Sequence, residues 1–441
     1  MKILFLVCIL CTSSAVAEDS WPAFLGVGGR LTNTDQLPLQ WSPTENIRWK
    51  QTIPGHGQSS PVVWDSTVFI TTTEGPNKDK FFVIAYDTNT GDEKWRHAIV
   101  NSDPVENSVY VSRAAATPVV DVHRVIGFFE SGQLICLDHA GKSLWQRDLG
   151  AEFGKFQNKF GLSASPTQDE SSVYILVDDE GPSYLTAIEK STGKSLWKSD
   201  RSARKSWASP TILPIGDVPQ LVISSGGAVD GYDCQTGSVL WTYDQVGGNS
   251  GTTPLSAGDG LFLVAGSPGR DGENTDMAKK SNLLMKVLKT GEDWVAKPVW
   301  ISDEATPSWG SPIVNGDCAY WVNRSGVVYC LDRQTGNLHY KQRTKESCWA
   351  TPFPTGDRIY FFGKDGTTTV LAAGREFQIL SVNQLWNPED AAVDPKAGAT
   401  ESDENRRRSA AMFSGPIQYG IAVANNCFFV RTGDQLFCIS E

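Results

Sequence analysis

Ala85-Tyr-Asp-Thr-Asn-Thr-Gly-Asp-Glu-Lys-Trp95 is the stretch that decides the fold, because close copies of it recur along the 441-residue chain. An apolar run, Phe81 to Ile84, leads into it. Asp87 and Gly91 are typical of a tight turn, and Trp95 restarts a half-buried strand. The stretch therefore predicts two antiparallel strands joined by a short polar turn.

Related turns span Ala187–Trp197, Gly231–Trp241 and Cys330–Tyr340, and a copy one residue shorter spans Cys136–Trp145. The aromatic residues that close such units form a series of eight: Trp49, Trp95, Trp145, Trp197, Trp241, Trp300, Tyr340 and Trp386. These residues are expected to pack between neighbouring repeats.

A second series of eight consists of a small residue and a proline: Ser60-Pro61, Thr117-Pro118, Ser165-Pro166, Ser209-Pro210, Thr253-Pro254, Ser311-Pro312, Thr351-Pro352 and Gly415-Pro416. A proline at the first residue of a strand removes no ladder hydrogen bond, so each pair is expected to begin one. Apolar runs between each proline and its aromatic residue complete four short strands per repeat.

Four-stranded units repeated at this spacing are typical of propeller blades. The sequence thus predicts an all-β fold, an eight-bladed β-propeller of four-stranded antiparallel blades over residues 47–441. The chain ends at Glu441 without a closing aromatic residue. The strand at Trp49 is therefore expected to complete the last blade and to cover its free edge.

The N-terminus resembles an export signal. Lys2 precedes nine apolar residues, and Ala15-Val16-Ala17 forms a small-x-small cleavage site. Nine residues are too few to cross a bilayer, which takes roughly 20. The sequence predicts a signal peptide over residues 1–17, cleaved after Ala17, then a leader over residues 18–46 that packs on the propeller. The exported protein is expected in the periplasm or outside the cell, without a transmembrane segment and as a monomer.

The charge of the chain excludes some partners. Loss of Lys2 with the signal peptide takes the formal net charge from −11 to −12, which disfavours nucleic acid and anionic lipid. Seven cysteines remain, without a Cys-x-x-Cys pair, so no metal site is expected. Cys136, Cys330 and Cys438 occupy a small apolar position of the repeat, where a buried thiol fits. Cys318 with Cys330, and Cys427 with Cys438, are expected either to stay as buried thiols or to form a bond across strands.

The repeated Ala-x-Asp-x-x-Thr-Gly-x-x-x-Trp pattern resembles the repeats of pyrroloquinoline quinone (PQQ)-type propellers, from about residue 47 to the end. That family includes quinoprotein alcohol dehydrogenases. It also includes non-enzymatic propellers, such as the lipoprotein of the outer-membrane β-barrel assembly machinery. The resemblance implies the fold and leaves two activities open.

Ligands of such a fold are expected at the mouth of the central channel, in the loops before the proline pairs. Three indoles stand at matching positions there, and they would form either a stacking floor for a ligand or a plug. His56 would act as a hydrogen-bonding group or serve the loop alone, and Arg113 would hold a carboxylate or pair with a neighbouring acid. The candidate binding residues are His56, Gln58, Arg113, Asn158, Trp207, Asn249, Trp309 and Trp349.

Two functions follow. The first is an exported, non-catalytic scaffold that binds a protein, peptide or glycan in the cell envelope, without a cofactor and without catalytic residues. The second is a PQQ- and calcium-dependent dehydrogenase, or another small-molecule enzyme, at the channel mouth. A calcium site needs several oxygen ligands with charge among them. No Asp or Glu stands next to the proline pairs, and no two cysteines are adjacent, which favours the scaffold.

Overall fold

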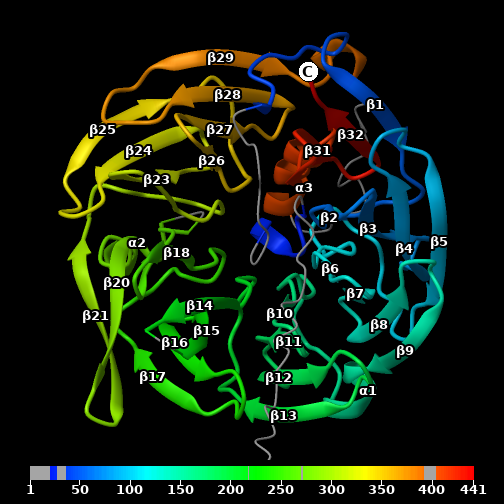
Figure 1. Ribbon diagram of the computed structural model, residues 1–441, viewed down its shortest axis with the longest axis horizontal. Coiled ribbons are helices and arrows are strands. Elements are labelled where there is room, and N and C mark those ends of the chain that lie inside the picture. The colour runs from blue at the N-terminus through cyan, green and yellow to red at the C-terminus, as the bar shows by residue number, and fades with distance from the viewer. Residues whose placement is uncertain (1–19, 27–35, 217, 270–271, 392–403) are drawn as a thin grey trace, which may run out of the picture.

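The computed structural model describes residues 20–26, 36–216, 218–269, 272–391 and 404–441. These residues form eight four-stranded antiparallel sheets, which surround a central channel as the blades of a propeller (Figure 1). The eight-bladed propeller predicted from the repeats is confirmed. The predicted signal peptide, residues 1–17, lies outside the described residues.

Each blade runs from an inner strand at the channel to an outer strand at the rim. The strands, in this order, are: blade 1, β2 (Val62–Trp64), β3 (Thr67–Glu74), β4 (Lys80–Asp87) and β5 (Glu93–Val100); blade 2, β6 (Val119–Val120), β7 (Arg124–Phe128), β8 (Gln133–Asp138) and β9 (Ser143–Asp148); blade 3, β10 (Thr167–Gln168), β11 (Ser172–Val177), β12 (Tyr184–Glu189) and β13 (Ser195–Asp200); blade 4, β14 (Thr211–Ile215), β15 (Val218–Ser225), β16 (Ala228–Asp233) and β17 (Val239–Tyr243); blade 5, β18 (Leu255–Gly258), β19 (Leu261–Val264), β20 (Leu283–Thr290) and β21 (Asp293–Ile301); blade 6, β22 (Ile313–Asn315), β23 (Cys318–Val322), β24 (Val327–Asp332) and β25 (Leu338–Arg343); blade 7, β26 (Phe353–Thr355), β27 (Arg358–Phe362), β28 (Thr367–Ala372) and β29 (Ile379–Gln384); blade 8, β30 (Gly420–Ala424), β31 (Cys427–Arg431), β32 (Gln435–Ile439) and β1 (Ile47–Thr52).

Short helices lie in the connections: η1 (Phe24–Gly26), α1 (Leu149–Phe153), α2 (Thr275–Ala278), η3 (Pro388–Asp390), α3 (Glu404–Ala410) and η4 (Ala411–Phe413). Within the described part of the chain, none of the helices has the length and apolar character that a membrane crossing requires.

The ring closes through the N-terminal strand, as predicted. β1 pairs antiparallel with β32, and Trp49 stands opposite Cys438. Blade 8 is thus made from both ends of the described chain, and β1 covers the edge that β32 would otherwise expose.

The aromatic residues join neighbouring blades through the glycine of the next turn. The Trp49 indole donates a hydrogen bond to the Thr88 carbonyl of blade 1, 2.9 Å away. Gly91 has a φ of +74°, and a Cβ there would lie 2.6 Å from the Trp49 ring. The same arrangement recurs with the following pairs: Trp95 with Gly141, Trp145 with Gly193, Trp197 with Gly237, and Trp300 with Gly336. The turn therefore requires glycine both for its backbone and for its contact with the indole.

The sequence pattern places two repeat positions wrongly in the last two blades. In blade 7, Val370 pairs with Ser381 where Ala85 pairs with Trp95 in blade 1. Trp386 follows β29 and instead stacks on Phe437 of blade 8, with ring centroids 6.3 Å apart. In blade 8, the two-residue hairpin between β30 and β31 puts Gly420 in the position of Ser60, so Gly415-Pro416 precedes the inner strand.

The residues before the prolines form a belt of hydrogen bonds around the channel. Ser60 donates its backbone N–H to the hydroxyl of Thr117, 2.9 Å away. The N–H groups of the next five positions each donate to a hydroxyl of the following blade over 2.9–3.0 Å: Thr117 to Ser165, Ser165 to Ser209, Ser209 to Thr253, Thr253 to Ser311, and Ser311 to Thr351. Serine or threonine is thus needed there for its hydroxyl as well as its size, and Gly420 interrupts the series.

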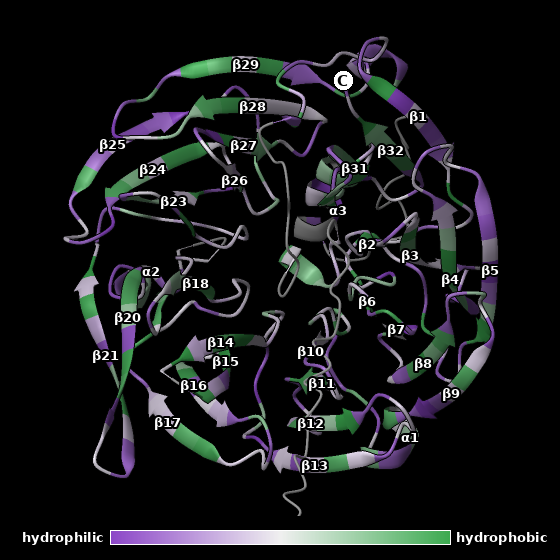
Figure 2. Ribbon diagram, in the orientation of Figure 1, coloured by the Kyte–Doolittle hydropathy of each residue, from purple (hydrophilic) through white to green (hydrophobic). Residues whose placement is uncertain are grey.

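The core lies between the blades, where the middle strands of each sheet face their neighbours. Every residue of β11 is buried, whereas the outer strand β13 has only exposed and half-buried residues. Hydrophobic residues accordingly concentrate on the middle strands, and hydrophilic residues occupy outer turns such as the tip of the β20–β21 hairpin (Figure 2).

The described leader residues continue this core into the channel. The backbone N–H and C=O of Trp21 both pair with Val63 over 2.9 Å, and the Pro22 carbonyl accepts from Val120 over 2.9 Å. Helix η1 follows and lies at the centre of the ring (Figure 1). Farther along the leader, Trp41 is buried and stacks on Tyr360 of blade 7, with ring centroids 6.4 Å apart.

Candidate functional site

The long connections of the propeller gather on one face. Because each blade is an antiparallel meander, every connection that precedes an inner strand lies at the same end of its sheet. We call this end the loop face; the connections before the inner strands that lie on it are residues 53–61, 101–118, 149–166, 201–210, 244–254, 302–312, 344–352 and the described parts of 385–419. All eight predicted site residues fall within it.

An aromatic row crosses the loop face above the channel. Tyr110 contacts Phe413 at 5.5 Å between ring centroids, Phe413 contacts Trp349 at 5.6 Å, and Trp349 contacts Trp309 at 4.6 Å. Trp309 is 42% exposed, although its side chain is a large apolar group. The Lys364 ammonium lies 5.3 Å from the Trp349 ring centroid. An exposed indole held by half-buried aromatic neighbours is typical of a recognition surface.

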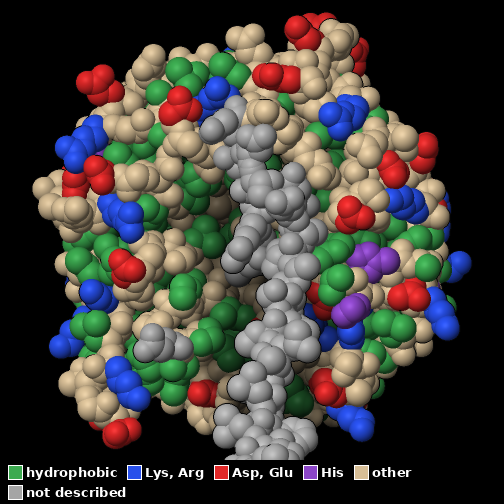
Figure 3. Space-filling model, in the orientation of Figure 1, with side chains coloured by type: hydrophobic (Ala, Val, Ile, Leu, Met, Phe, Trp, Pro, Cys, Tyr) green, Lys and Arg blue, Asp and Glu red, His purple; other side chains and the backbone are tan. Residues whose placement is uncertain are grey.

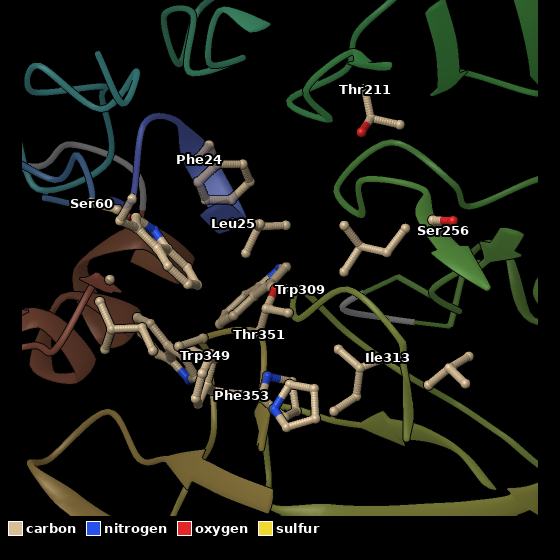
Figure 4. Close-up of a pocket in the computed structure, with 18 of the residues that line it drawn as sticks. Phe24, Leu25, Ser60, Thr211, Ser256, Trp309, Ile313, Trp349, Thr351 and Phe353 are labelled. Carbon is tan, nitrogen blue, oxygen red and sulfur yellow. The ribbon is translucent and has the colours of Figure 1, made fainter. Parts of the chain in front are cut away.

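A cavity of about 580 Å³ opens beside this row and runs along the channel. Inner strands of blades 4 to 8 form its wall, with residues such as Leu213, Ile313 and Phe353. Phe24 and Leu25 of η1 project into the channel from the opposite side, toward Trp309 (Figure 4). Figure 3 shows the opposite end of the channel, where the hairpin turns lie, and hydrophobic side chains border the central hollow there.

Of the three predicted indoles, the structure brings Trp309 and Trp349 into contact. Trp207 packs on Phe160 instead, with ring centroids 6.2 Å apart, and its indole donates to the Gly161 carbonyl over 3.3 Å. Trp207, Trp309 and Gln58 do line one smaller cavity of about 380 Å³. The three indoles therefore surround the channel mouth without forming a single floor.

His56 and Arg113 line a third cavity, of about 770 Å³, at the junction of blades 8 and 1. Tyr419 stands between them and the channel, because its side chain lines this cavity as well as the channel cavity. The His56 and Tyr419 rings meet edge to face at 6.0 Å. The structure thus brings these two predicted residues together.

The remaining two predicted residues hold loops in place. The buried Asn249 amide donates to Ser224 over 3.0 Å and to the Ala228 carbonyl over 2.9 Å, and its oxygen accepts from Gly227. The Asn158 side-chain oxygen accepts from the backbone of Phe160 over 3.0 Å. These contacts lie within single blades or loops and do not include the aromatic row.

The sequence pattern missed Tyr110 and the leader residues Phe24 and Leu25. Tyr110 lies in a loop without a repeat signal. The leader is rich in aromatic residues, but it has no periodicity that would place it in the channel. Phe413 was recognisable from its place in the loop before Pro416.

The residues that line the channel do not fit a quinone with calcium. Among the described residues, none of those that line the 580 Å³ cavity is an Asp or Glu. Over the described residues, no group of three or more His, Cys, Asp or Glu side chains is arranged to hold a metal ion. A hard cation would lack the charged oxygen ligands that it needs here.

His56 gives this face a specific pH dependence. Burial, followed by the positive charges of Arg113 and Arg431, holds the pKa of His56 well below its usual value of 6.5. Below pH 6.5, His56 therefore binds a proton in the unfolded chain but stays neutral in the folded protein. The folded state loses stability as the pH falls, by up to about 1.4 kcal/mol per pH unit.

We expect the His56→Gln variant to lose less stability than the wild type between pH 6.5 and 5.5. Denaturant midpoints measured at both pH values would show this. Equal losses in the two proteins would contradict the position assigned to His56.

The fold defines the class of this protein: an eight-bladed propeller of PQQ-like repeats. The model of the family described as outer membrane protein assembly factor BamB matches residues 31–155, 108–299 and 296–405. Together these matches span most of the chain, and the chain belongs to this family.

A relative in Burkholderia pseudomallei (strain K96243), outer membrane protein assembly factor BamB, is 26% identical over 247 residues. The matched region covers 55% of this chain and 60% of the relative, which is less than two thirds of the relative's length.

Solved structures show the same fold at low sequence identity. BamB from Moraxella catarrhalis has a TM-score of 0.58 at 13% identity, covering 90% of this chain and 97% of that one. The quinohemoprotein alcohol dehydrogenase ADHIIG from Pseudomonas putida HK5 has a TM-score of 0.54 at 13% identity, covering 96% and 80%. The fold is thus shared by an assembly factor and an enzyme, and the site has to distinguish them.

Proposed function

We propose that this protein is a non-catalytic scaffold of the cell envelope, which binds a protein partner during outer membrane protein assembly. The observation that carries the proposal is the aromatic row on the loop face, in a chain that belongs to the BamB family. The described residues that line the channel cavity include no carboxylate, which supports binding over quinone chemistry. The predicted signal peptide supports export to the compartment where such a partner is found.

The aromatic row has the properties of an interface centre. Trp and Tyr are enriched among the residues that dominate binding energies, especially where they are held rigidly beside a pocket. Trp349 is held between Phe413 and Trp309, which lie 5.6 and 4.6 Å away. Such a group loses little conformational entropy when a partner covers it.

The test is quantitative capture of envelope proteins by the full-length exported protein. We expect the wild type to recover a component of the outer membrane assembly apparatus. The Trp309→Ala/Trp349→Ala variant is expected to bind the same component at least about 30-fold more weakly, because a dominant interface aromatic contributes about 2 kcal/mol or more.

Trp294→Ala is the matched control. Trp294 is a half-buried indole on the β20–β21 hairpin, outside the loop face. Its replacement is expected to leave capture unchanged. Equal loss in both variants, or no loss in the double variant, would remove the aromatic row from the interface.

A further inference from the structure

Two buried guanidinium groups lie at the junction of blades 8 and 1 without a carboxylate partner. Arg431, at the end of β31, is fully buried. It donates to the Ser59 carbonyl over 3.2 Å, to the Thr71 carbonyl over 2.6 Å and to the Ser59 hydroxyl. All three acceptors are neutral, and Nε has no partner. Among the described residues, no Asp or Glu lies within 4 Å of either the Arg431 or the Arg113 guanidinium.

Arg113 is the member of this pair that reaches a cavity. Its backbone N–H donates to the Gln58 side-chain oxygen over 2.9 Å, and its carbonyl accepts from the Gln58 backbone N–H over 3.0 Å. Its side chain lines the 770 Å³ cavity, and the Tyr419 hydroxyl is its hydrogen-bonding neighbour. The Nε atom of Arg113 is buried and without a partner. Burial lowers the pKa of Arg113, which shows how little solvent compensates its charge.

Arg201, another buried arginine of the chain, has its charge compensated by carboxylates. Arg201 lies 2.9 Å from the Asp178 carboxylate and 3.4 Å from that of Asp230. Buried charges are normally paired in this way, because desolvation without a partner is costly. Arg113 and Arg431 depart from this rule, so a partner that is not part of the described chain would satisfy them.

The cavity has room for an anionic group and for an apolar body attached to it. Its charged and titratable lining, among the described residues, consists of Lys50, His56, Arg113, Asp390, Tyr419 and Asp434. Asp390 accepts from Asn387 over 2.8 Å, and Asp434 accepts from Thr432 over 3.3 Å, so both acids have local partners. Behind Arg113, the buried Glu130 is paired with Lys78 at 3.2 Å.

Apolar groups form the rest of the wall. The Trp386, Phe413 and Phe437 rings line the same cavity. His56 faces the site with a buried Nδ1 that has no hydrogen-bond partner, and a neutral imidazole can donate or accept there.

We propose that this cavity binds a carboxylate carried on an aromatic or aliphatic body, with Arg113 holding the carboxylate and His56 and Tyr419 beside it. In the cell, the carboxylate would be an acidic group of a bound polypeptide. The inference rests on the proposed function only in this choice of ligand. Arg113 suits the role because a guanidinium matches a carboxylate with two parallel hydrogen bonds.

The test uses two probes of the same shape. Indole-3-acetate and its neutral amide, indole-3-acetamide, are titrated into the full-length protein by calorimetry, with the His56 imidazole signals followed by NMR. Hydrogen bonds to a charged group contribute about 1.5–3 kcal/mol, so we expect the carboxylate to bind at least about tenfold tighter than the amide. The imidazole signals of His56 are expected to shift with the carboxylate.

Variants separate Arg113 from the rest of the wall. In Arg113→Gln the preference is expected to fall to about one, and Arg113→Lys is expected to retain part of it. Arg96→Gln is the matched control, because Arg96 is an exposed arginine of the outer strand β5. It is expected to keep the full preference.

Equal affinities for the two probes, no measurable binding of either, or a preference that persists in Arg113→Gln would overturn the inference. If Arg113→Gln fails to fold, the wild-type preference and the His56 shift decide. A preference in the wild type together with unaltered partner capture by Trp309→Ala/Trp349→Ala would reject the proposed interface and leave the carboxylate site standing.

Discussion

Replacing Arg201 with methionine is expected to lower the free energy of unfolding by about 3–5 kcal/mol, the usual cost of breaking a buried ion pair from one side. Arg201 follows β13 of blade 3, and its side chain is 1% exposed. It joins Asp178, which follows β11, to Asp230 of β16 in blade 4. The residue therefore ties two blades together near the loop face.

The expected effect is large because methionine would leave the carboxylates of Asp178 and Asp230 without the Arg201 charge. Asp178 is fully buried, and one of its carboxylate oxygens has no partner even with Arg201 present. Burial by itself lowers the pKa of Arg201, but Asp178, Tyr232 and Asp230 hold it above its usual value. Without the guanidinium, the buried Asp178 would lose its only ion pair among the described residues, and Asp230 would keep only Arg204, 3.7 Å away. The two carboxylates would then destabilise the folded state or take up protons.

Chemical denaturation at pH 7 measures this effect. Arg204→Met is the control, because Arg204 is more exposed and lies 3.7 Å from Asp230; a loss below about 1 kcal/mol is expected for it. The double variant Arg201→Met/Asp178→Leu should recover part of the stability, since it removes one of the stranded charges. A loss below about 1 kcal/mol for Arg201→Met would contradict the assigned role.

Replacing Trp49 with alanine is expected to cost about 3–5 kcal/mol, the range for deleting a buried aromatic side chain. Trp49 is 8% exposed and packs on Phe429, with ring centroids 5.9 Å apart. Its indole also makes the 2.9 Å hydrogen bond to Thr88 that joins blade 8 to blade 1. Since β1 is the strand that closes the ring, the loss is expected to loosen the closure itself.

Thermal and chemical denaturation of Trp49→Ala and Trp294→Ala would test this role. We expect Trp294→Ala to lose about 1 kcal/mol or less of its free energy of unfolding. Gly91→Ala tests the same joint from the other side, because its Cβ would lie 2.6 Å from the Trp49 ring at a φ of +74°. Stability of Trp49→Ala equal to that of Trp294→Ala would mean that the Trp49 side chain does not stabilise the closure of the ring.

The repeat motif was sufficient to predict the blades because its residues make the contacts that define a blade. Asp87 accepts backbone hydrogen bonds within the turn from Asn89 and Thr90, at 2.8 and 3.1 Å. Gly91 and Trp49 then form the joint between two blades. Each of these requirements is local or repeated, so the sequence displays it directly.

The last two blades were harder to predict because other residues replace the motif. Ser381 stands where an indole stands elsewhere, and Gly420 replaces the serine or threonine of the hydroxyl belt. Trp386 lies five residues after Ser381, and Pro416 lies four residues before Gly420. In the sequence they therefore look like the aromatic residue and the proline of the repeat. The strand register is needed to show that Ser381 and Gly420 occupy these repeat positions.

The candidate site depends on contacts between distant loops, which a single sequence does not display. Trp207, Trp309 and Trp349 occupy similar positions before their prolines, but only the last two touch. The entry of Phe24 and Leu25 into the channel depends on pairing between Trp21 and Val63, which no repeat announces.

Site-specific photo-crosslinking tests the central claim, that the aromatic row on the loop face is where the partner binds. A photoreactive aromatic residue is placed at position 309 in one protein and at position 294 in another, and each is exported and irradiated in cells. The proposed function predicts that position 309 crosslinks to a component of outer membrane protein assembly and that position 294 does not. Crosslinking of that component from position 294 alone, or from neither position, would contradict it.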